Sequence, residues 1–146
     1  MFRTYDIKEI RILPMCNTQQ QKEYGFENDD EVRDYLSEGL PSTEKGKYYY
    51  KERGIDLYDT DALILFQYGG RILGYGIYKD RNCDDRYFQF YPESIHNVEE
   101  ISADEVRSVY PSFKRFVRMQ KIPLDYLEAI TPLLKRKQKL FVASKH

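Results

Sequence analysis

The hydrophobic and polar positions of the chain divide it into short strand-like and helix-like segments. The clearest is a β-hairpin: residues 62–68 (ALILFQY) form an apolar run, Gly69 and Gly70 supply the positive φ angles of a tight turn, and residues 71–78 return. Gly74 and Gly76 interrupt the returning strand, where glycine typically marks a bulge or a close backbone approach. The pattern therefore predicts a curved sheet.

Further strands are expected around this hairpin. Residues 7–15 alternate well enough for a strand that ends near Pro14, residues 86–93 form an aromatic-rich strand, and residues 94–101 give a shorter one. Residues 41–59 are polar and broken by glycines, although they hold three consecutive tyrosines. We expect a long loop there, and long loops in compact domains are often functional.

Helix signals lie on both sides of these strands. Asn28 or Asp29 is placed to cap a helix of about three turns, which Gly39 is expected to end. Ser102 and Glu105 have the spacing of a capping box and predict a short helix that ends before Pro111. The apolar stripe and basic end of residues 124–140 predict a last helix after Pro123, which Pro132 is expected to kink or restart.

Length and composition indicate one globular domain that spans residues 1–146. No run of 18 or more apolar residues could cross a bilayer, and the N-terminus lacks the features of a secretory signal, so we expect a cytoplasmic protein without membrane contact. Cys16 and Cys83 are the only cysteines, which favours neither a disulfide framework nor a structural zinc site.

Charge is unevenly distributed along the chain. Residues 1–110 carry 14 Lys or Arg against 22 Asp or Glu, a net of −8, whereas residues 111–146 carry nine against two, a net of +7. Cations that share a face can bind the phosphates of a nucleic acid, although the helix dipole alone also favours cations near a helix C-terminus. The phosphate-binding candidates are Lys114, Arg115, Arg118 and Lys121.

Residues for catalysis are scarce. His96 and His146 are the only histidines, and His96 has no second histidine or cysteine nearby, so a metal site or a catalytic triad lacks its parts. The glycines of residues 69–76 lie on a hairpin and not between a strand and a helix, which disfavours a phosphate-cradling loop. The sequence predicts no metal and no cofactor, and it favours a binding protein over an enzyme.

Residues 54–78 (GIDLYDTDALILFQYGGRILGYGIY) resemble the core of the PUA-like superfamily, which includes EVE, ASCH and YTH-type domains. The matching features are the apolar strand, the turn at Gly69, and the Gly-x-Gly of Gly74 and Gly76 in the next strand. Residues 102–130 also look like the PUA-like domains found ahead of nuclease modules in modification-dependent restriction proteins. The resemblance covers roughly residues 10–135 and implies an α+β fold, a small curved β-barrel flanked by helices.

In several branches of this superfamily the pocket accepts a modified or flipped base, and the resemblance implies such a pocket here. A flipped base is stacked between aromatic faces, and its edge is read by polar groups. The candidate pocket residues are Asn17, Tyr48, Tyr49, Tyr50, Gln67, Tyr68 and Tyr78. For each tyrosine, packing in the sheet is the competing interpretation.

We therefore expect a nucleic-acid reader whose partner is DNA or RNA. Any cutting would require a separate nuclease partner, because these 146 residues hold no nuclease motif. Two alternatives remain open. One is a protein-interaction or small-ligand module on the same barrel, and the other is an ASCH-type enzyme that processes RNA or nucleotides, which would need a Lys or Tyr with a perturbed pKa in the pocket.

Overall fold

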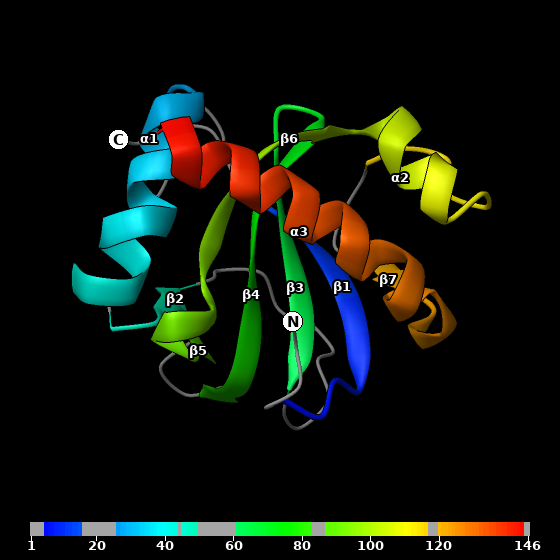
Figure 1. The fold of residues 1–146 in the computed structure, drawn as a ribbon. Coiled ribbons are helices and arrows are strands. Elements are labelled where there is room, and N and C mark those ends of the chain that lie inside the picture. Colours follow the sequence, from blue (N-terminus) through cyan, green and yellow to red (C-terminus); the bar gives the residue numbers. More distant parts are fainter. Residues whose placement is uncertain are drawn as a thin grey trace.

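The computed structural model describes residues 5–15, 26–43, 45–49, 61–82, 87–116 and 120–144 (Figure 1). The strands in these residues are β1 (Glu9–Pro14), β2 (Lys47–Tyr49), β3 (Ala62–Tyr68), β4 (Arg71–Asn82), β5 (Tyr87–Phe90), β6 (His96–Ser102) and β7 (Gln120–Ile122). The helices are α1 (Asp29–Asp34), the π-helix η1 (Tyr35–Thr43), α2 (Ala103–Val109) and α3 (Leu127–Ser144), with short 3₁₀ turns η2 (Pro92–Ser94) and η3 (Leu124–Tyr126). No helix in the described ranges is long and apolar enough to span a bilayer.

The strands form one mixed sheet in the order β2-β5-β4-β3-β1-β7, and β6 pairs with β4 outside this path. The α+β class is confirmed, but the predicted closed barrel is not found. Among the described residues β2 pairs with β5 and β7 with β1, so the two ends of the sheet do not meet. Helices α1 and η1 pack against β2, β4 and β6 and cover the apolar interior in place of a closing strand.

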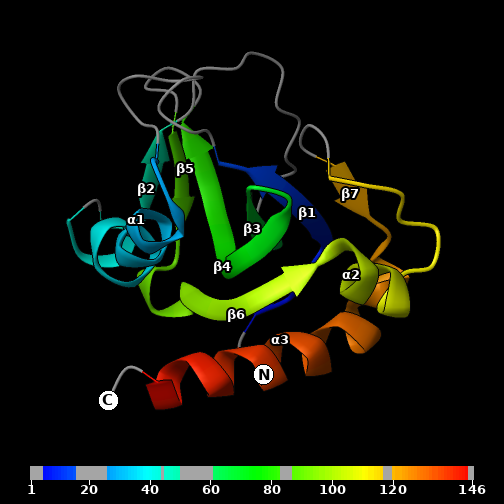
Figure 2. The same cartoon turned by 90° about the horizontal axis from the view of Figure 1, so that it is seen from above.

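The long strand β4 curves because its two halves pair with different strands. Its first half, from Arg71 to Tyr75, pairs with β6, and its second half, from Tyr78 onward, pairs with β5. The register shifts between Ile72 and Gly74, as the glycine pattern predicts for a bulge. Figure 2 shows the resulting curvature, with β6 turned away from the plane of β1 and β3.

Both faces of the sheet are buried, which explains why residues 62–66 are apolar without alternation. We call the cluster beneath α1 and η1 the α1-side core; its buried residues are Leu13, Met15, Phe26, Val32, Leu36, Leu40, Tyr48, Ala62, Ile64, Phe66, Tyr68, Leu73, Tyr78, Phe88, Phe90 and Ile95. We call the other cluster, beneath α2 and α3, the α3-side core; it contains Ile7, Ile10, Ile12, Leu63, Leu65, Ile72, Tyr75, Ile77, Val98, Ile101, Val106, Phe113, Ile122, Ile130, Leu133 and Leu134.

The helix signals are mostly confirmed. Asn28 caps α1 by accepting a hydrogen bond from the Glu31 amide, and Ser102 and Glu105 form the predicted capping box of α2. The predicted stop at Gly39 is wrong, because the chain continues as η1 to Thr43. Gly39 instead makes room for a ring: a Cβ there would lie 2.8 Å from Cδ1 of Tyr35. The predicted restart at Pro132 is also not found, since α3 is one element from Leu127 to Ser144.

Candidate functional site

Three of the predicted pocket tyrosines lie in the α1-side core. Tyr48, Tyr68 and Tyr78 are 5%, 9% and 1% exposed. Their rings contact other aromatic rings. The ring centroids of Tyr48 and Phe66 are 6.4 Å apart, and those of Tyr78 and Phe88 are 5.8 Å apart in an edge-to-face arrangement. These tyrosines therefore contribute to the packing beneath α1 and η1, and none of the three presents an open ring face for stacking.

Gln67 and Tyr68 point to opposite faces of the sheet, although they were predicted to share a pocket. Successive side chains of a strand alternate between faces, and Phe66 and Tyr68 both belong to the α1-side core. The side chain of Gln67 is half-buried on the other face, and the backbone carbonyl of Gln67 accepts a 2.7 Å hydrogen bond from the backbone amide of Met15. The remaining predicted pocket positions, Asn17, Tyr50 and the Tyr49 side chain, lie outside the described residues.

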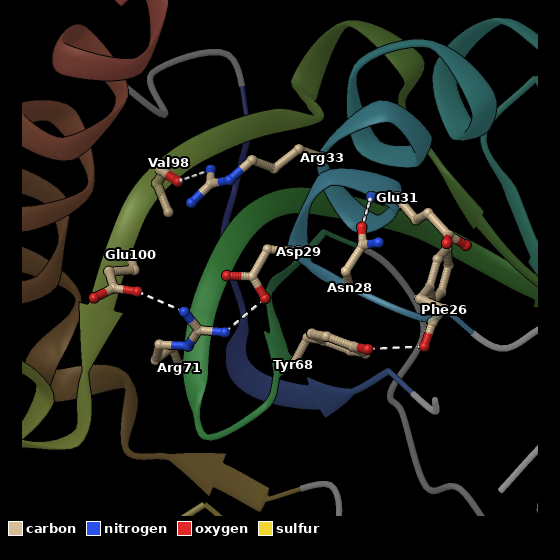
Figure 3. A network of polar contacts seen from close by, with 9 residues as sticks. All are labelled: Phe26, Asn28, Asp29, Glu31, Arg33, Tyr68, Arg71, Val98 and Glu100. Atoms are coloured by element: carbon tan, nitrogen blue, oxygen red, sulfur yellow. Dashed lines mark hydrogen bonds and ion pairs between the residues drawn. The ribbon is translucent and has the colours of Figure 1, made fainter. Parts of the chain in front are cut away.

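A polar network fixes the turn end of the β3–β4 hairpin (Figure 3). The hydroxyl of Tyr68 donates a 2.8 Å hydrogen bond to the carbonyl of Phe26, and burial is the main cause that raises the pKa of this hydroxyl. Arg71 contacts Asp29 at the start of α1 and Glu100 on β6, each at 2.6 Å. The hydrogen bond to Asp29, followed by that to Glu100, raises the pKa of the Arg71 guanidinium. The network joins the hairpin to α1 and β6.

Exposed cations gather along the edge strand β7 and the segment before it. We call Lys114, Arg115 and Lys121 the basic edge; all three are exposed, whereas the predicted Arg118 lies outside the described residues. The backbone that carries them is held firmly, because Arg107 donates a 2.6 Å hydrogen bond to the carbonyl of Lys114. The side-chain amide of Gln120 donates at 3.1 Å to the carbonyl of Arg115.

The basic edge also lies near the end of the sheet to which Gln67 belongs. Gln120 of β7 stands opposite Ile12 of β1, and two residues further along β1 Pro14 stands opposite Gln67 of β3. Exposed acids lie both far from and close to the basic edge. Asp30 and Glu31 occupy the first turn of α1, on the far side of the sheet from β7 (Figures 1 and 2), whereas the exposed Asp125 follows Lys121 by four residues. The basic edge is therefore separated from the acidic start of α1, but not from every exposed acid.

Solved structures share the fold of this chain. The chain is similar to ASCH from Zymomonas mobilis, with a TM-score of 0.54 and 9% identity over 85% of this chain and 94% of that chain. A mutant of that ASCH protein gives a TM-score of 0.54 and 8% identity over 86% of this chain and 99% of that chain. The chain has a PUA-like fold. The predicted resemblance is confirmed for the fold, and identities this low extend it no further.

A YTH domain was also found, that of the Zygosaccharomyces rouxii MRB1 protein in complex with N6-methyladenosine RNA. Its TM-score is 0.48 with 13% identity, over 88% of this chain and 90% of that chain. No protein-family model matches the chain, and no curated protein sequence matches it either.

The PUA-like sheet also buries a charged pair that the sequence analysis missed. Glu9 is only 2% exposed, and its Oε1 lies 2.5 Å from Nε of Arg11, whose side chain is 14% exposed. Both are on β1, where they alternate with Ile10 and Ile12 of the α3-side core, so they face the α1 side of the sheet. The signal in the sequence was the pair of opposite charges two residues apart within a predicted strand.

A second polar pair lies on the α3 side of the sheet and concerns the alternative that the protein is an ASCH-type enzyme. Tyr75 donates a hydrogen bond to Oε1 of Gln138 on α3, and burial raises the pKa of its hydroxyl far above the ordinary value. Its ring centroid lies 5.4 Å from that of His96, whose pKa is lowered by burial. A tyrosine with a raised pKa keeps its proton near neutral pH, so neither Tyr75 nor Tyr68 is suited to act as a general base. Among the described residues, no three His, Cys, Asp or Glu side chains gather as a metal site would require.

Proposed function

We propose that this PUA-like chain is a nucleic-acid-binding domain whose basic edge contacts phosphates. The observation that carries the proposal is the position of Lys114, Arg115 and Lys121. All three side chains are exposed at one edge of the sheet, away from the acidic start of α1. Side-chain hydrogen bonds fix the backbone of Lys114 and Arg115, and Lys121 lies on strand β7. Because this backbone is already ordered, binding of phosphates by its cations does not carry the entropic cost of ordering a loop.

The finer part of the proposal is that the domain reads a modified or flipped base. Because Tyr48, Tyr68 and Tyr78 pack in the α1-side core, contact with the base falls to the other predicted positions. These are Asn17, Gln67, Tyr49 and Tyr50, which can supply amides for the base edge and rings for stacking.

Charge reversal tests the phosphate contacts. The double variant Arg115→Glu/Lys121→Glu removes two cations from the basic edge, and Lys135→Glu/Arg136→Glu makes the same change of charge at exposed positions on α3. Fluorescence anisotropy with labelled single-stranded RNA, measured over a series of salt concentrations, gives the affinity and its salt dependence. We expect the first variant to bind more weakly and to lower the salt slope by about 1.4, the value for two lost phosphate contacts on a single strand.

The α3 variant is expected to retain most of the affinity and the wild-type slope. Equal losses in both variants would contradict the proposal, because they would show a response to net charge and not to the basic edge. Circular dichroism of each variant establishes that its fold is intact.

A further inference from the structure

Two tyrosine rings meet beside the basic edge. Tyr110 ends α2, and Tyr126 lies in η3, between β7 and α3. Helix α2 contacts α3 (Figure 2), and the centroids of the two rings are 4.6 Å apart with a tilt of 52° between their planes. The fold therefore brings together aromatic residues from two different elements.

Both tyrosines remain partly open to solvent. Each is half-buried and packs from outside against the α3-side core. Within the described residues neither hydroxyl takes part in a hydrogen bond, and neither is among the buried polar groups that lack a partner, so both hydroxyls reach solvent. Leu124, the one exposed large hydrophobic side chain of the described ranges, lies in the same turn as Tyr126. Apolar and aromatic groups are therefore accessible on η3 and at the end of α2.

Two exposed cations follow Tyr110 closely. The amide of Phe113 donates a 3.0 Å hydrogen bond to the carbonyl of Tyr110, which closes a turn and keeps the Cα atoms of its two ends within about 7 Å. Lys114 comes directly after this turn, followed by Arg115. Neither cation takes part in an ion pair in the part of the chain that the structure describes.

We propose that Tyr110 and Tyr126 form a stacking platform for an unpaired base of a single-stranded nucleic acid. Lys114 and Arg115 bind the phosphates next to that base. Aromatic rings beside a positively charged track suit a single strand of any sequence, because every base has a π-face. The inference rests on the proposed function and names the substrate class of the basic edge, a single strand in preference to a duplex.

The charges around the rings fit a base better than a phosphate. Asp125 and Glu128 are exposed on either side of Tyr126, and they would repel a phosphate over the rings but not an uncharged base. The tilt between the rings lets a base stack on one of them while its edge contacts the other. Tyrosine also provides this contact area at a low cost in side-chain entropy.

Variants that remove or retain the rings test the platform. Tyr110→Leu and Tyr126→Leu remove a ring but keep an apolar side chain, whereas Tyr110→Phe and Tyr126→Phe keep the ring. Tyr91→Leu is the matched control. Tyr91 is half-buried against the same core, its ring centroid lies 5.0 Å from that of Tyr5, and its amide bonds to β4, which β3 and β1 separate from β7. Fluorescence anisotropy with labelled single-stranded RNA, alone and annealed to its complement, gives each affinity and its salt dependence.

For the two Leu variants we expect the affinity for single-stranded RNA to fall about tenfold with an unchanged salt slope, because stacking is lost and no phosphate contact is. Their affinity for the duplex should not change. The Phe variants and Tyr91→Leu should bind like the wild type, and circular dichroism establishes that each variant is folded. Equal losses in the Leu and Phe variants would overturn the platform.

The chain contains no tryptophan, which permits a direct measurement of stacking. Tyr110→Trp and Tyr126→Trp each introduce a single indole, whose fluorescence is quenched when a base stacks on it. Tyr91→Trp is the control. We expect single-stranded RNA to quench the fluorescence of the first two variants and not that of the control. Binding of RNA without quenching at either platform position would overturn the inference.

The platform and the proposed function fail separately. If RNA binds with a salt slope that Arg115→Glu/Lys121→Glu lowers, but both Leu variants bind like the wild type, the platform is overturned and the proposed function stands. If the Leu variants weaken binding and the charge-reversal variant keeps the wild-type slope, the platform stands and the phosphate contacts of the basic edge fail. Absence of binding to any strand would overturn both and would favour a protein partner for this surface.

Discussion

Replacing Gly74 with alanine would disturb the close approach on which the curvature of β4 depends. The new Cβ would lie 2.5 Å from Cδ1 of Leu36 and 2.7 Å from the backbone oxygen of His96. The Leu36 methyl group can move, but His96 begins β6, which pairs with β4 at this point through Gly74 and Asn97. Relief of the second contact therefore requires a shift of β6 itself.

The expected magnitude follows from two opposing effects. Overpacking in a well-packed core costs about 1–3 kcal/mol, whereas replacing glycine with alanine restricts the unfolded chain and returns about 0.4–1 kcal/mol. The net destabilisation by Gly74→Ala is then about 1–2 kcal/mol. Gly76→Ala is the matched control, because its Cβ would meet only side-chain atoms of Ile95, Phe90 and Phe66, at 3.2 to 3.5 Å.

Urea unfolding followed by circular dichroism measures both variants. For Gly74→Ala we expect a lower midpoint with an unchanged slope, which is the signature of lost stability without a change in compactness. For Gly76→Ala we expect a free energy of unfolding within about 0.5 kcal/mol of the wild type. Its tightest contact, at 3.2 Å, is with a side-chain atom of Ile95 that can shift, so the cost of this contact and the chain-entropy gain nearly cancel. Equal stability of the two variants would refute the assignment of Gly74 to the contact with β6.

The same urea assay checks two further predictions at hydrogen bonds. Tyr68→Phe leaves the Phe26 carbonyl without its hydroxyl donor and should lower the free energy of unfolding by about 1 kcal/mol, whereas no change would show that water replaces the hydroxyl. Burial raises the pKa of Glu105, but hydrogen bonds from Lys137 and Ser102 together lower it by more. The pKa of Glu105 therefore lies below its ordinary value of 4.5. The resulting stabilisation is present above that ordinary pKa and is lost as pH falls through the folded-state pKa. Glu105→Gln should therefore reduce the acid sensitivity of unfolding, and an unchanged pH profile would count against these contacts.

The elements that sequence analysis predicted correctly are those that local chemistry specifies. The Gly69-Gly70 turn and the capping box of Ser102 and Glu105 each depend on residues within a few positions of one another. Strands β2 and β7 were missed because each has only three residues and exists through a partner distant in sequence, β5 and β1 respectively. The closed barrel was predicted from the family resemblance and is not found among the described strands. The helices α1 and η1 cover the sheet instead, and no short sequence pattern specifies their position.

The candidate site was predictable to a similar degree. Exposure of Lys114, Arg115 and Lys121 agrees with their place in a basic segment, while the roles of Tyr48 and Tyr78 could not be read from residue type. A tyrosine suits both a core and a pocket, and only the packing of η1 over the sheet decides between them. The register that places Arg11 of β1 opposite Lys121 of β7 joins residues that are 110 positions apart in the chain, so no local pattern reveals it.

The most direct test of the central claim is the binding of the purified wild-type protein to matched oligonucleotides. Single-stranded and duplex RNA and DNA, each plain and base-modified, are titrated at two salt concentrations. We expect an affinity that falls as the salt concentration rises, with a slope that corresponds to several phosphate contacts. We also expect a preference for one base modification. No salt-sensitive binding to any of these oligonucleotides would contradict it and would favour a protein-interaction or small-ligand module.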